Sequence, residues 1–489
     1  MESYDVVIVG LGPTGGTLAN LLALNGQSVL ILEREKSIYN LPRAVHFDDE
    51  VMRVFESIGI SKSLSRNIII NKGTKFVNAQ NEVVLDWPRP RSITDNGWYP
   101  SYRFHQPNLE RLLRKRLNDF KKVSIRRNTQ VVKIINSDNH VEITIEDKET
   151  NKISSIKSSY VVGCDGAGSI TREEMGYKLE NLGFTQKWAV VDLILKKDKK
   201  ELADRTIQYA NSERPATYCR NVGKRRRWEF AILDHENETE ILSDKYIWNF
   251  LKPWLLPHEA ELERKTIYTF QSAIAKRWRT GRVFIVGDAA HLMPPFMGQG
   301  MCSGIRDASN LAWKINLCLK NNHNERLLDT YQSERFSNVE EYIQTTMRMG
   351  EFVNDIGASK ITSNIAKGPD GTMSMKSIQP QLGSGLGESS DKNRGKVFPQ
   401  LVMKNGNRLD LSFTGLPVLL LAEDLKDINV TSKIKCFYES QIPGLAEVLR
   451  NYKAKAVIVR PDRFVLETCS SINELNDFIK NKLNELNIL

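Results

Sequence analysis

The chain has 489 residues, of which 40% are apolar and 26% are charged. This composition is typical of globular domains and argues against a disordered, collagenous or coiled-coil protein. At about 150 residues per domain, the length predicts about three domains. Lysine and arginine outnumber aspartate and glutamate by 69 to 59, a net charge of +10. The positive residues are spread along the chain, so we expect no nucleic-acid partner and interpret the basic run 224–227 as a solvated strand face.

The cysteine, histidine and hydropathy patterns exclude further classes. The six cysteines include no Cys-x-x-Cys pair, which argues against a disulfide framework and a zinc ribbon. The seven histidines have no metal-binding spacing, so we predict no metal site. The apolar runs 6–9 and 416–422 are far shorter than the ~18 residues of a membrane span. The first ten residues lack the features of a signal peptide, and we expect a cytoplasmic protein with no membrane span.

Residues 5–33 are predicted to form a strand, a tight turn, a helix and a second strand. The apolar run 6–9 is typical of a parallel strand covered on both faces. The turn consists of Gly10, Leu11, Gly12, Pro13, Thr14 and Gly15. The following helix carries leucines at helical spacing, Gly26 ends it, and Glu33 closes the second strand at 28–32.

The spacing Gly10-x-Gly12-x-x-Gly15 between a strand and a helix predicts a dinucleotide site. The first glycine allows the tight turn, the second lets the backbone approach a pyrophosphate, and the third lets helix and strand pack closely. The N-terminus of the helix faces the anion. Glu33 is placed to accept hydrogen bonds from a ribose diol. This motif alone does not separate FAD from NAD.

The rest of the chain is predicted to alternate between helices and strands. Apolar periodicity predicts helices over 107–120 and 305–319. Alternation predicts a meander of strands over 131–135, 141–145 and 153–158, a short strand at 160–162, and a buried strand at 283–286. Residues 177–275 are interpreted as a separate unit, 351–395 as a linker or mobile loop, and 396–489 as a small α/β domain.

A second cluster of chemistry lies at 281–304. The buried strand delivers Asp288 to the carboxyl edge of the predicted sheet, where its carboxylate can bind a polyol hydroxyl. Pro294, Pro295, Gly298 and Gly300 then form a loop with little side-chain bulk, directly before a helix. Its backbone N–H groups and the helix N-terminus can stabilise negative charge on a flat ring.

Three segments together resemble the fingerprints of class A FAD-dependent aromatic hydroxylases, which have the para-hydroxybenzoate hydroxylase fold. They are the glycine turn with Glu33, the Cys164-Asp165-Gly166 segment, and Gly287-Asp288. Residues 42–60, 103–114, 225–230, 288–315 and 459–466 resemble the 3-(3-hydroxyphenyl)propionate hydroxylase branch in particular.

The resemblance implies an α/β fold in which a Rossmann-like FAD-binding domain is interleaved with a mixed-sheet substrate domain. The FAD-binding domain would comprise 1–75, 100–176 and 277–350, and the substrate domain 76–99 and 177–276. Residues 396–489 would form a thioredoxin-like domain without dithiol chemistry, in a structural or homodimer-contact role. The FAD contacts implied are Gly10, Gly12, Pro13, Thr14, Gly15, Glu33, Arg34, Arg43, Gln106, Asp165, Gly287, Asp288, Pro295, Gly298, Gln299, Gly300 and Met301.

The implied reaction uses NAD(P)H to reduce FAD and O₂ to form a flavin C4a-hydroperoxide, which hydroxylates a phenolic substrate such as 3-(3-hydroxyphenyl)propionate. We predict that His46 is catalytic and assists phenol deprotonation or orients the phenol; the alternative is that it only packs near the flavin. His291 is predicted to be structural and Cys302 to be a packing residue. The sequence does not choose an arginine for an acidic substrate among Arg205, Arg214, Arg220 and others.

Other functions stay open from the sequence alone. An FAD oxidoreductase that transfers no oxygen shares the same fingerprints. Relatives of this class also act on antibiotics or polyketides. A flavin-dependent halogenase is disfavoured because its Trp-x-Trp-x-Ile-Pro signature is absent. A nucleic-acid-binding protein would instead show tight, salt-sensitive binding and no flavin.

Overall fold

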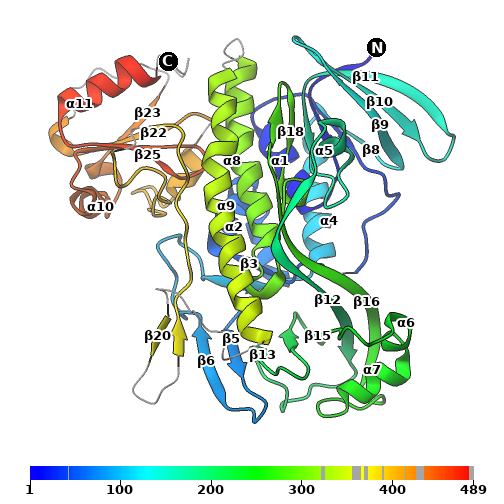
Figure 1. Cartoon of the computed structure of the whole chain (residues 1–489). Helices are drawn as coiled ribbons and strands as arrows, with labels where there is room; N and C mark the ends of the chain where they lie inside the picture. Colours follow the sequence, from blue (N-terminus) through cyan, green and yellow to red (C-terminus); the bar gives the residue numbers. More distant parts are fainter. Residues whose placement is uncertain are drawn as a thin grey trace.

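The computed structural model describes residues 1–41, 43–320, 325–354, 365–367, 373–387, 390–413, 415–425 and 434–483. The strands of these segments form sheets of eight, ten, four and three strands. Helices α8 (Gly300–Lys320) and α9 (Glu325–Asn354) run side by side through the middle of the molecule, with the C-terminal sheet beside them (Figure 1).

The eight-stranded sheet is built around β1 (Ser3–Val9), which pairs in parallel with β2 (Val29–Leu32) and β11 (Lys152–Gly163). Val6 and Ile8 pack into the core beneath helix α1 (Pro13–Leu24), while Val7 and Val9 pack into a core on the other face. Both faces are therefore buried, which explains the continuous apolar run. The other strands are β8 (Val123–Arg126), β9 (Thr129–Asn136), β10 (Val141–Asp147), β17 (Arg279–Thr280) and β18 (Val283–Ile285).

β11 departs from the prediction of two separate strands. Its first part pairs antiparallel with β10, as expected for the meander, and its last part pairs in parallel with β1 and β18. No turn residue interrupts the segment between Ser158 and Tyr160, so one strand serves both neighbours. The strand ends at Gly163, directly before the Cys164-Asp165-Gly166 segment.

The ten-stranded sheet has two chemically different faces. Along β15 (Arg225–Ala231), Trp228 and Phe230 pack into a core with helices α6 (Glu238–Ile241) and α7 (Asp244–Leu251), whereas Arg227 and Glu229 face the opposite side. The strand order is β19-β16-β12-β15-β14-β13-β5-β6-β21-β20. The bounds are β5 (Gly73–Val77), β6 (Val83–Pro88), β12 (Leu179–Leu195), β13 (Thr206–Tyr209), β14 (Ala216–Arg220), β16 (Ala260–Ala275), β19 (His291–Leu292), β20 (Ile365–Lys367) and β21 (Met373–Met375).

A three-stranded sheet joins the two large sheets. It consists of β3 (His46–Asp48), β7 (Ser101–Arg103) and β4 (Ile69–Ile70), with β7 in the centre. Phe47 and Tyr102 stack at 5.2 Å and pack against helix α2 (Asp49–Ile58). The alternate residues His46, Ser101 and Arg103 therefore face the other way. The remaining nearby helices are α3 (Ser61–Leu64), α4 (Gln106–Leu117) and α5 (Ile170–Glu174).

The C-terminal sheet has the strand order β23-β22-β24-β25, with β22 and β23 parallel and the other pairs antiparallel. This arrangement agrees with the thioredoxin-like expectation, and the predicted fold class is confirmed. The elements are β22 (Val418–Leu421), β23 (Lys435–Tyr438), α10 (Leu445–Tyr452), β24 (Ala456–Val459), β25 (Val465–Cys469) and α11 (Ile472–Asp477).

Two other segments differ from the sequence prediction. Part of the predicted linker 351–395 lies outside the described residues, but β20 and β21 within it form a hairpin that extends the ten-stranded sheet through β6. Helix α8 begins at Gly300 rather than 305, because glycine backbone can enter a helix inside a loop whose composition predicts no helix. The domain boundaries stay a prediction.

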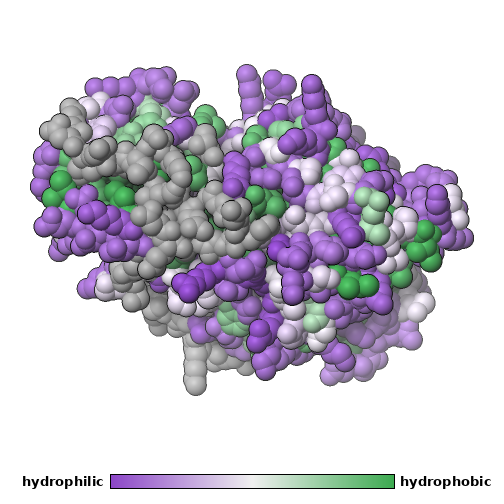
Figure 2. Space-filling model, turned by 90° about the horizontal axis from the view of Figure 1, so that it is seen from above, coloured by the Kyte–Doolittle hydropathy of each residue, from purple (hydrophilic) through white to green (hydrophobic). Residues whose placement is uncertain are grey.

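Hydrophilic side chains cover most of the surface seen from above, and hydrophobic ones form small separate groups there (Figure 2). Within the described residues, none of the helices is both long and apolar enough to cross a membrane. The described residues also contain no cluster of three potential metal ligands.

Candidate functional site

Two connected cavities lie where the sheets meet. The outer cavity, about 540 Å³, is lined by the glycine turn, Glu33 and Arg114. The inner cavity, about 330 Å³, lies between the loop 293–301 and the ten-stranded sheet. Gly12, Pro13, Arg43, Gln106, Cys164 and Gly166 line both.

The glycine turn is shaped by backbone crowding at its first and third glycines. Gly10 has φ +98°, and a Cβ there would lie 2.5 Å from the carbonyl oxygen of Cys164. A Cβ at Gly15 would lie 2.1 Å from the carbonyl oxygen of Gly10. A Cβ at Gly12 would meet no atom within 4 Å, because this position faces the cavities. The open space in front of Gly12, at the N-terminus of α1, fits a pyrophosphate.

Glu33 and Arg34 lie at the far end of the outer cavity. The Glu33 carboxylate accepts hydrogen bonds from the backbone N–H groups of Leu11 at 2.8 Å and Glu35 at 2.9 Å. These bonds orient the carboxylate and leave lone pairs for a ribose diol. Arg34 is exposed and pairs with Glu35 at 3.4 Å.

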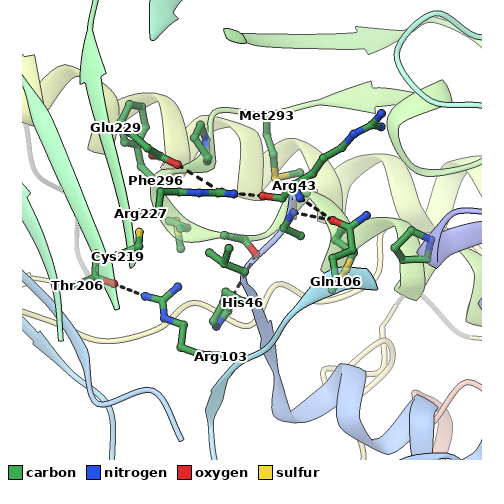
Figure 3. A pocket seen from close by; sticks show the side chains of 18 of the residues that line it. Arg43, His46, Arg103, Gln106, Thr206, Cys219, Arg227, Glu229, Met293 and Phe296 are labelled. Atoms are coloured by element: carbon green, nitrogen blue, oxygen red, sulfur yellow. Dashed lines mark hydrogen bonds and ion pairs between the residues drawn. The ribbon is translucent and has the colours of Figure 1, made fainter. Parts of the chain in front are cut away.

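Gln106 positions the chain around Arg43. Its side-chain oxygen accepts hydrogen bonds from the backbone N–H groups of Arg43 at 3.1 Å and Ala44 at 2.7 Å. Its side-chain nitrogen donates to Glu110 at 2.9 Å. Gln106 therefore holds the segment that passes between the two cavities (Figure 3).

Asp288 and the loop after it form one wall of the inner cavity. The Asp288 side chain faces the cavity interior and has no hydrogen bond or ion pair with any described residue. The side chain is open to the cavity, and desolvation by the surrounding protein groups raises its pKa. Pro295, Gly298, Gly300 and Met301 line the same cavity, and α8 begins there. Gly287 packs against Thr14, where a Cβ would lie 3.1 Å from the hydroxyl oxygen.

Two predicted FAD contacts use their side chains elsewhere. Asp165, which lines the outer cavity, accepts hydrogen bonds from Thr171 and from Ser169, the N-cap residue of α5. Gln299 donates to Asp48 at 3.2 Å and accepts from Arg306 at 3.0 Å. These bonds hold both side chains in place, and the FAD contacts expected of the two residues stay a prediction.

His46 bridges β7 and the cavity loop. Its Nδ1 lies 3.1 Å from the Gly298 carbonyl oxygen, which only accepts, so Nδ1 carries the proton. Its Nε2 lies 2.7 Å from the Ser101 hydroxyl, which in turn accepts from Asn71. Burial, with the charges of Arg103 and Arg89, lowers the pKa of His46 to about 3. The imidazole is therefore neutral, with both nitrogens engaged.

His291 and Cys302 occupy structural positions. His291 is buried and pairs with Asp307 at 2.7 Å, and Asp307 also accepts from Arg335 at 2.7 Å. Cys302 is buried in the core beneath α2. These positions agree with the roles expected from the sequence.

The opposite wall of the inner cavity is polar and was not found by sequence reasoning. It is the free face of the ten-stranded sheet and carries Thr74, Thr206, Gln208, Thr217, Cys219, Arg227 and Glu229. Alternation along each strand indicates such a face, but only the tertiary structure shows what it covers. Thr217 donates to Gln208 at 2.5 Å.

The interpretation of the basic run as a solvated face is wrong for Arg226 and Arg227, which are both buried. Arg227 forms a two-point ion pair with Asp192 at 2.7 and 3.0 Å. It also donates to the carbonyl oxygen of Arg43 at 2.8 Å, which links the ten-stranded sheet to the backbone segment that Gln106 holds (Figure 3). Arg225 and Arg227 pair with the distant Glu263 and Asp192, which no local pattern reveals. Arg226 instead donates to the nearby backbone carbonyls of Gly223 and Arg225.

Comparisons with known proteins agree with this geometry. A family described as FAD binding domain matches residues 3–346. The chain is 37% identical over 407 residues to a probable NADH-specific resorcinol 4-hydroxylase of Rhodococcus jostii (strain RHA1), covering 82% of this chain and 75% of that protein. It is also 37% identical over 334 residues to 3-(3-hydroxy-phenyl)propionate/3-hydroxycinnamic acid hydroxylase 2 of Burkholderia vietnamiensis (strain G4 / LMG 22486).

The second alignment covers 68% of this chain and 60% of the Burkholderia protein, so this chain spans less than two thirds of that relative. Among solved structures, the flavin-dependent monooxygenase PieE in complex with FAD and substrate superposes with a TM-score of 0.83 at 18% identity. That superposition covers 100% of this chain and 99% of PieE and shows the shared fold.

The fold and the paired cavities define a flavoprotein of mixed α/β architecture, with FAD as its cofactor. The chain belongs to the FAD-dependent aromatic hydroxylases, the class A flavin monooxygenases. The family predicted from the sequence is therefore confirmed.

The residues present fit FAD. The open space in front of Gly12 suits the pyrophosphate, and the unpaired Asp288 carboxylate suits the hydroxyls of the ribityl chain. The backbone at Pro295 to Met301, with the α8 N-terminus, can face the flavin ring. The assignment of single residues to FAD stays a prediction.

Proposed function

We propose that the protein uses NAD(P)H and O₂ to hydroxylate a small phenolic substrate, with 3-(3-hydroxyphenyl)propionate as the first compound to test. In the balanced reaction, NAD(P)H, a proton, O₂ and the phenol give NAD(P)⁺, water and a ring carrying one further hydroxyl. The observation that carries the proposal is the polar sheet face opposite the loop 293–301, which provides hydrogen-bonding groups across a narrow cavity. The name of the Burkholderia relative supports the compound.

Resorcinol is the second candidate, because the relative aligned over most of this chain is named as a resorcinol 4-hydroxylase. That relative is also named as NADH-specific, which favours NADH as the reductant here.

The residues around the cavities divide the work of such a reaction. Gly12 and Glu33 would hold the nucleotide part of FAD, and Asp288 the ribityl chain. Once bound and reduced, FAD supplies the activation of O₂ and the transfer of one oxygen atom to an electron-rich ring. The protein positions the substrate against the polar sheet face and keeps water out of the cavity.

For His46 we propose a positioning role: it fixes the Gly298 carbonyl through Nδ1–H and is held by Ser101 through Nε2. The alternative, phenol deprotonation by His46, needs a free ring nitrogen. We expect His46→Ala to lower kcat by roughly tenfold to a hundredfold through a misplaced loop, without moving the pH profile. His46→Gln, whose amide can keep both bonds, should restore most of the rate. Loss of an ionisation from the kcat/KM profile in His46→Ala would support deprotonation instead.

A panel of phenols tests the proposed function directly. We expect 3-(3-hydroxyphenyl)propionate to stimulate NADH oxidation and to yield, in equal amount, a product heavier by one oxygen atom. An ¹⁸O₂ experiment should place the label in the product. NADH oxidation with a reduced product would favour an oxidoreductase without oxygen transfer. Hydroxylation of polycyclic polyketides alone would favour the antibiotic or polyketide alternative and contradict the small phenol.

A further inference from the structure

We propose that Arg103 is the anion anchor of the substrate site: its guanidinium binds an oxyanion carried by the aromatic substrate. This rests on the proposed function and narrows it, because it requires a negatively charged group on the compound that enters the inner cavity. The oxyanion could be the carboxylate of a phenolic acid or the phenolate oxygen of the ring itself.

Strand geometry directs Arg103 into the cavity. In β7, Tyr102 packs into the core with Phe47, so its neighbours Ser101 and Arg103 face the other side. Arg103 lies directly opposite His46 in the antiparallel pair of β7 and β3. Its side chain lines the inner cavity and extends toward Thr206 and Cys219 (Figure 3).

Arg103 is buried without a negative partner. The residue is only 7% exposed, and the one hydrogen bond that its side chain makes with a described residue is donated to the Thr206 hydroxyl. Within the described part of the chain, no carboxylate lies within 4.0 Å of it. A buried guanidinium without a counter-ion is costly, and such groups are retained where a ligand supplies the missing charge.

Four other arginines in or beside this sheet are already neutralised by carboxylates. Arg205 pairs with Asp86, Arg214 with Glu236 at 2.6 Å, and Arg220 with Asp204 at 2.5 Å. These were the candidates that the sequence offered for an acidic substrate. Arg227 is held by Asp192. Arg103 and Arg89 therefore remain as arginines of the inner cavity that have no carboxylate partner among the described residues. Of these two, Arg103 is the one that hydrogen-bonds to the polar sheet face, through Thr206.

The surroundings add positive charge rather than remove it. Arg89, which also lines the inner cavity, stacks on Trp87 at 4.0 Å and donates to Ser377. Burial lowers the pKa of Arg89 to about 10, so it is charged at neutral pH. His46 between them is neutral. This end of the cavity therefore carries two guanidinium groups beside one uncharged imidazole.

Among the carboxyl groups in and around the inner cavity, Glu229 and Asp288 line it, whereas Asp192 and Asp48 lie outside its lining. Glu229 lies 3.6 Å from Arg227, and burial raises its pKa, which favours the neutral form. Asp192 is bound to Arg227 and lies 3.9 Å from Arg264. Asp48 is paired with Arg306, and Asp288 belongs to the cofactor side. None of them occupies the Arg103 donors.

The test compares anionic and neutral aromatics on the FAD-loaded protein. The probes are 3-phenylpropionate and its amide, 3-phenylpropanamide, titrated by the change in flavin absorbance. We expect Arg103→Met to lower the affinity for 3-phenylpropionate by about tenfold or more, because a charge-assisted hydrogen bond is lost. The affinity for the amide should not change. The affinity of Arg103→Lys for 3-phenylpropionate should lie between those of the wild type and Arg103→Met. Arg220→Gln removes a neutralised arginine of the same sheet and should change the affinity for neither probe.

A second arm separates the two sources of the oxyanion. Resorcinol is titrated from about pH 7 to about pH 10, across the ordinary pKa of a phenol. If the phenolate is the anion, resorcinol binds more tightly as pH rises in the wild type and not in Arg103→Met, while 3-phenylpropionate shows no preference for Arg103. Either pattern supports the anchor. The anchor would be overturned if Arg103→Met lost equal affinity for charged and neutral probes, or lost affinity for none of them.

Two further readouts guard against misfolding and against failure of the proposed function. Because Arg103 has no counter-ion among the described residues, Arg103→Met should retain FAD and keep or raise the melting temperature. Added 3-phenylpropionate should raise the melting temperature of the wild type but not of Arg103→Met. Neither phenyl probe has a ring hydroxyl, so binding is measured without turnover. If no phenol is hydroxylated but the anion preference depends on Arg103, the function fails and the anchor stands.

Discussion

Gly10 and Gly12 lie two residues apart in one turn, yet an added methyl group would meet different surroundings at each. At Gly10 it would collide with the Cys164 carbonyl, and the φ of +98° is strained for any other residue. At Gly12, whose φ is −76°, it would project into the cavities. One glycine therefore serves the fold and the other serves the ligand.

This contrast gives a prediction at the scale of single residues. We expect Gly12→Ala to fold with an unchanged melting temperature of the FAD-free protein but to bind FAD at least about tenfold more weakly, because the methyl occupies the pyrophosphate space. Gly10→Ala should lose more than about 1 kcal/mol of stability before any ligand is added. Thermal unfolding and FAD titration measure the two effects separately. Normal FAD affinity in Gly12→Ala would contradict the assignment.

At the scale of elements, a buried ion triad fastens α2 to the C-terminal part of the chain. Asp410 accepts from Arg53 at 2.8 and 2.9 Å and from Arg463 at 2.8 Å, and all three side chains are nearly fully buried. Arg53 also donates to the carbonyl oxygen of Phe398. The triad joins segments that are more than three hundred residues apart.

Removing the charge of Asp410 should therefore destabilise the folded protein strongly. We expect Asp410→Asn to lower the free energy of unfolding by about 3–5 kcal/mol, because two buried guanidinium groups lose their counter-ion. The matched control is Asp424→Asn, which breaks the exposed pair with Lys455, where both side chains are more than half exposed. That change should cost less than about 1 kcal/mol. Urea unfolding of both variants measures the difference, and equal costs would refute the triad's role.

At the scale of the whole molecule, buried carboxylates make stability depend on acid. Burial alone would raise the pKa of Glu334, but the charges of Arg460 and Lys314 outweigh it and lower the pKa. The same holds for Asp410 between Arg53 and Arg463. A carboxyl group with a lowered pKa stabilises the fold fully above its ordinary value and loses that contribution as pH falls below it.

We therefore expect the free energy of unfolding to fall as pH drops below about 4.5, the upper end of ordinary carboxyl pKa values. Asp410→Asn removes one of the groups involved, so its stability should fall less steeply over the same pH range. The exposed Asp424→Asn control should follow the wild type. Urea unfolding at a series of pH values gives the slopes. A wild-type stability that is flat below pH 4.5, or equal slopes in all three proteins, would contradict this origin.

Much of the cofactor half could be predicted because its signals are local. The apolar run of β1, the glycine turn and Glu33 lie within thirty-three residues, and each has a steric or hydrogen-bonding reason that is visible in the chain. Asp288 was predicted to contact FAD because a buried strand precedes it, and it lines the inner cavity. Motifs do not reveal the local partners of Asp165 and Gln299, whose side chains bind Thr171 and Arg306 respectively.

By itself, the sequence determined the layered α/β fold and a dinucleotide site, because these depend on periodicity and on motifs of adjacent residues. Its resemblance to the class A hydroxylases added the family and FAD. Only the tertiary structure decided which charges meet. Arg227 binds Asp192 and Arg53 binds Asp410, whereas among the described residues the Arg103 side chain donates only to the hydroxyl of Thr206. Charge neutralisation is a contact between distant parts of the chain, so the polar wall of the cavity and its unpaired arginine became visible only when the sheets were placed together.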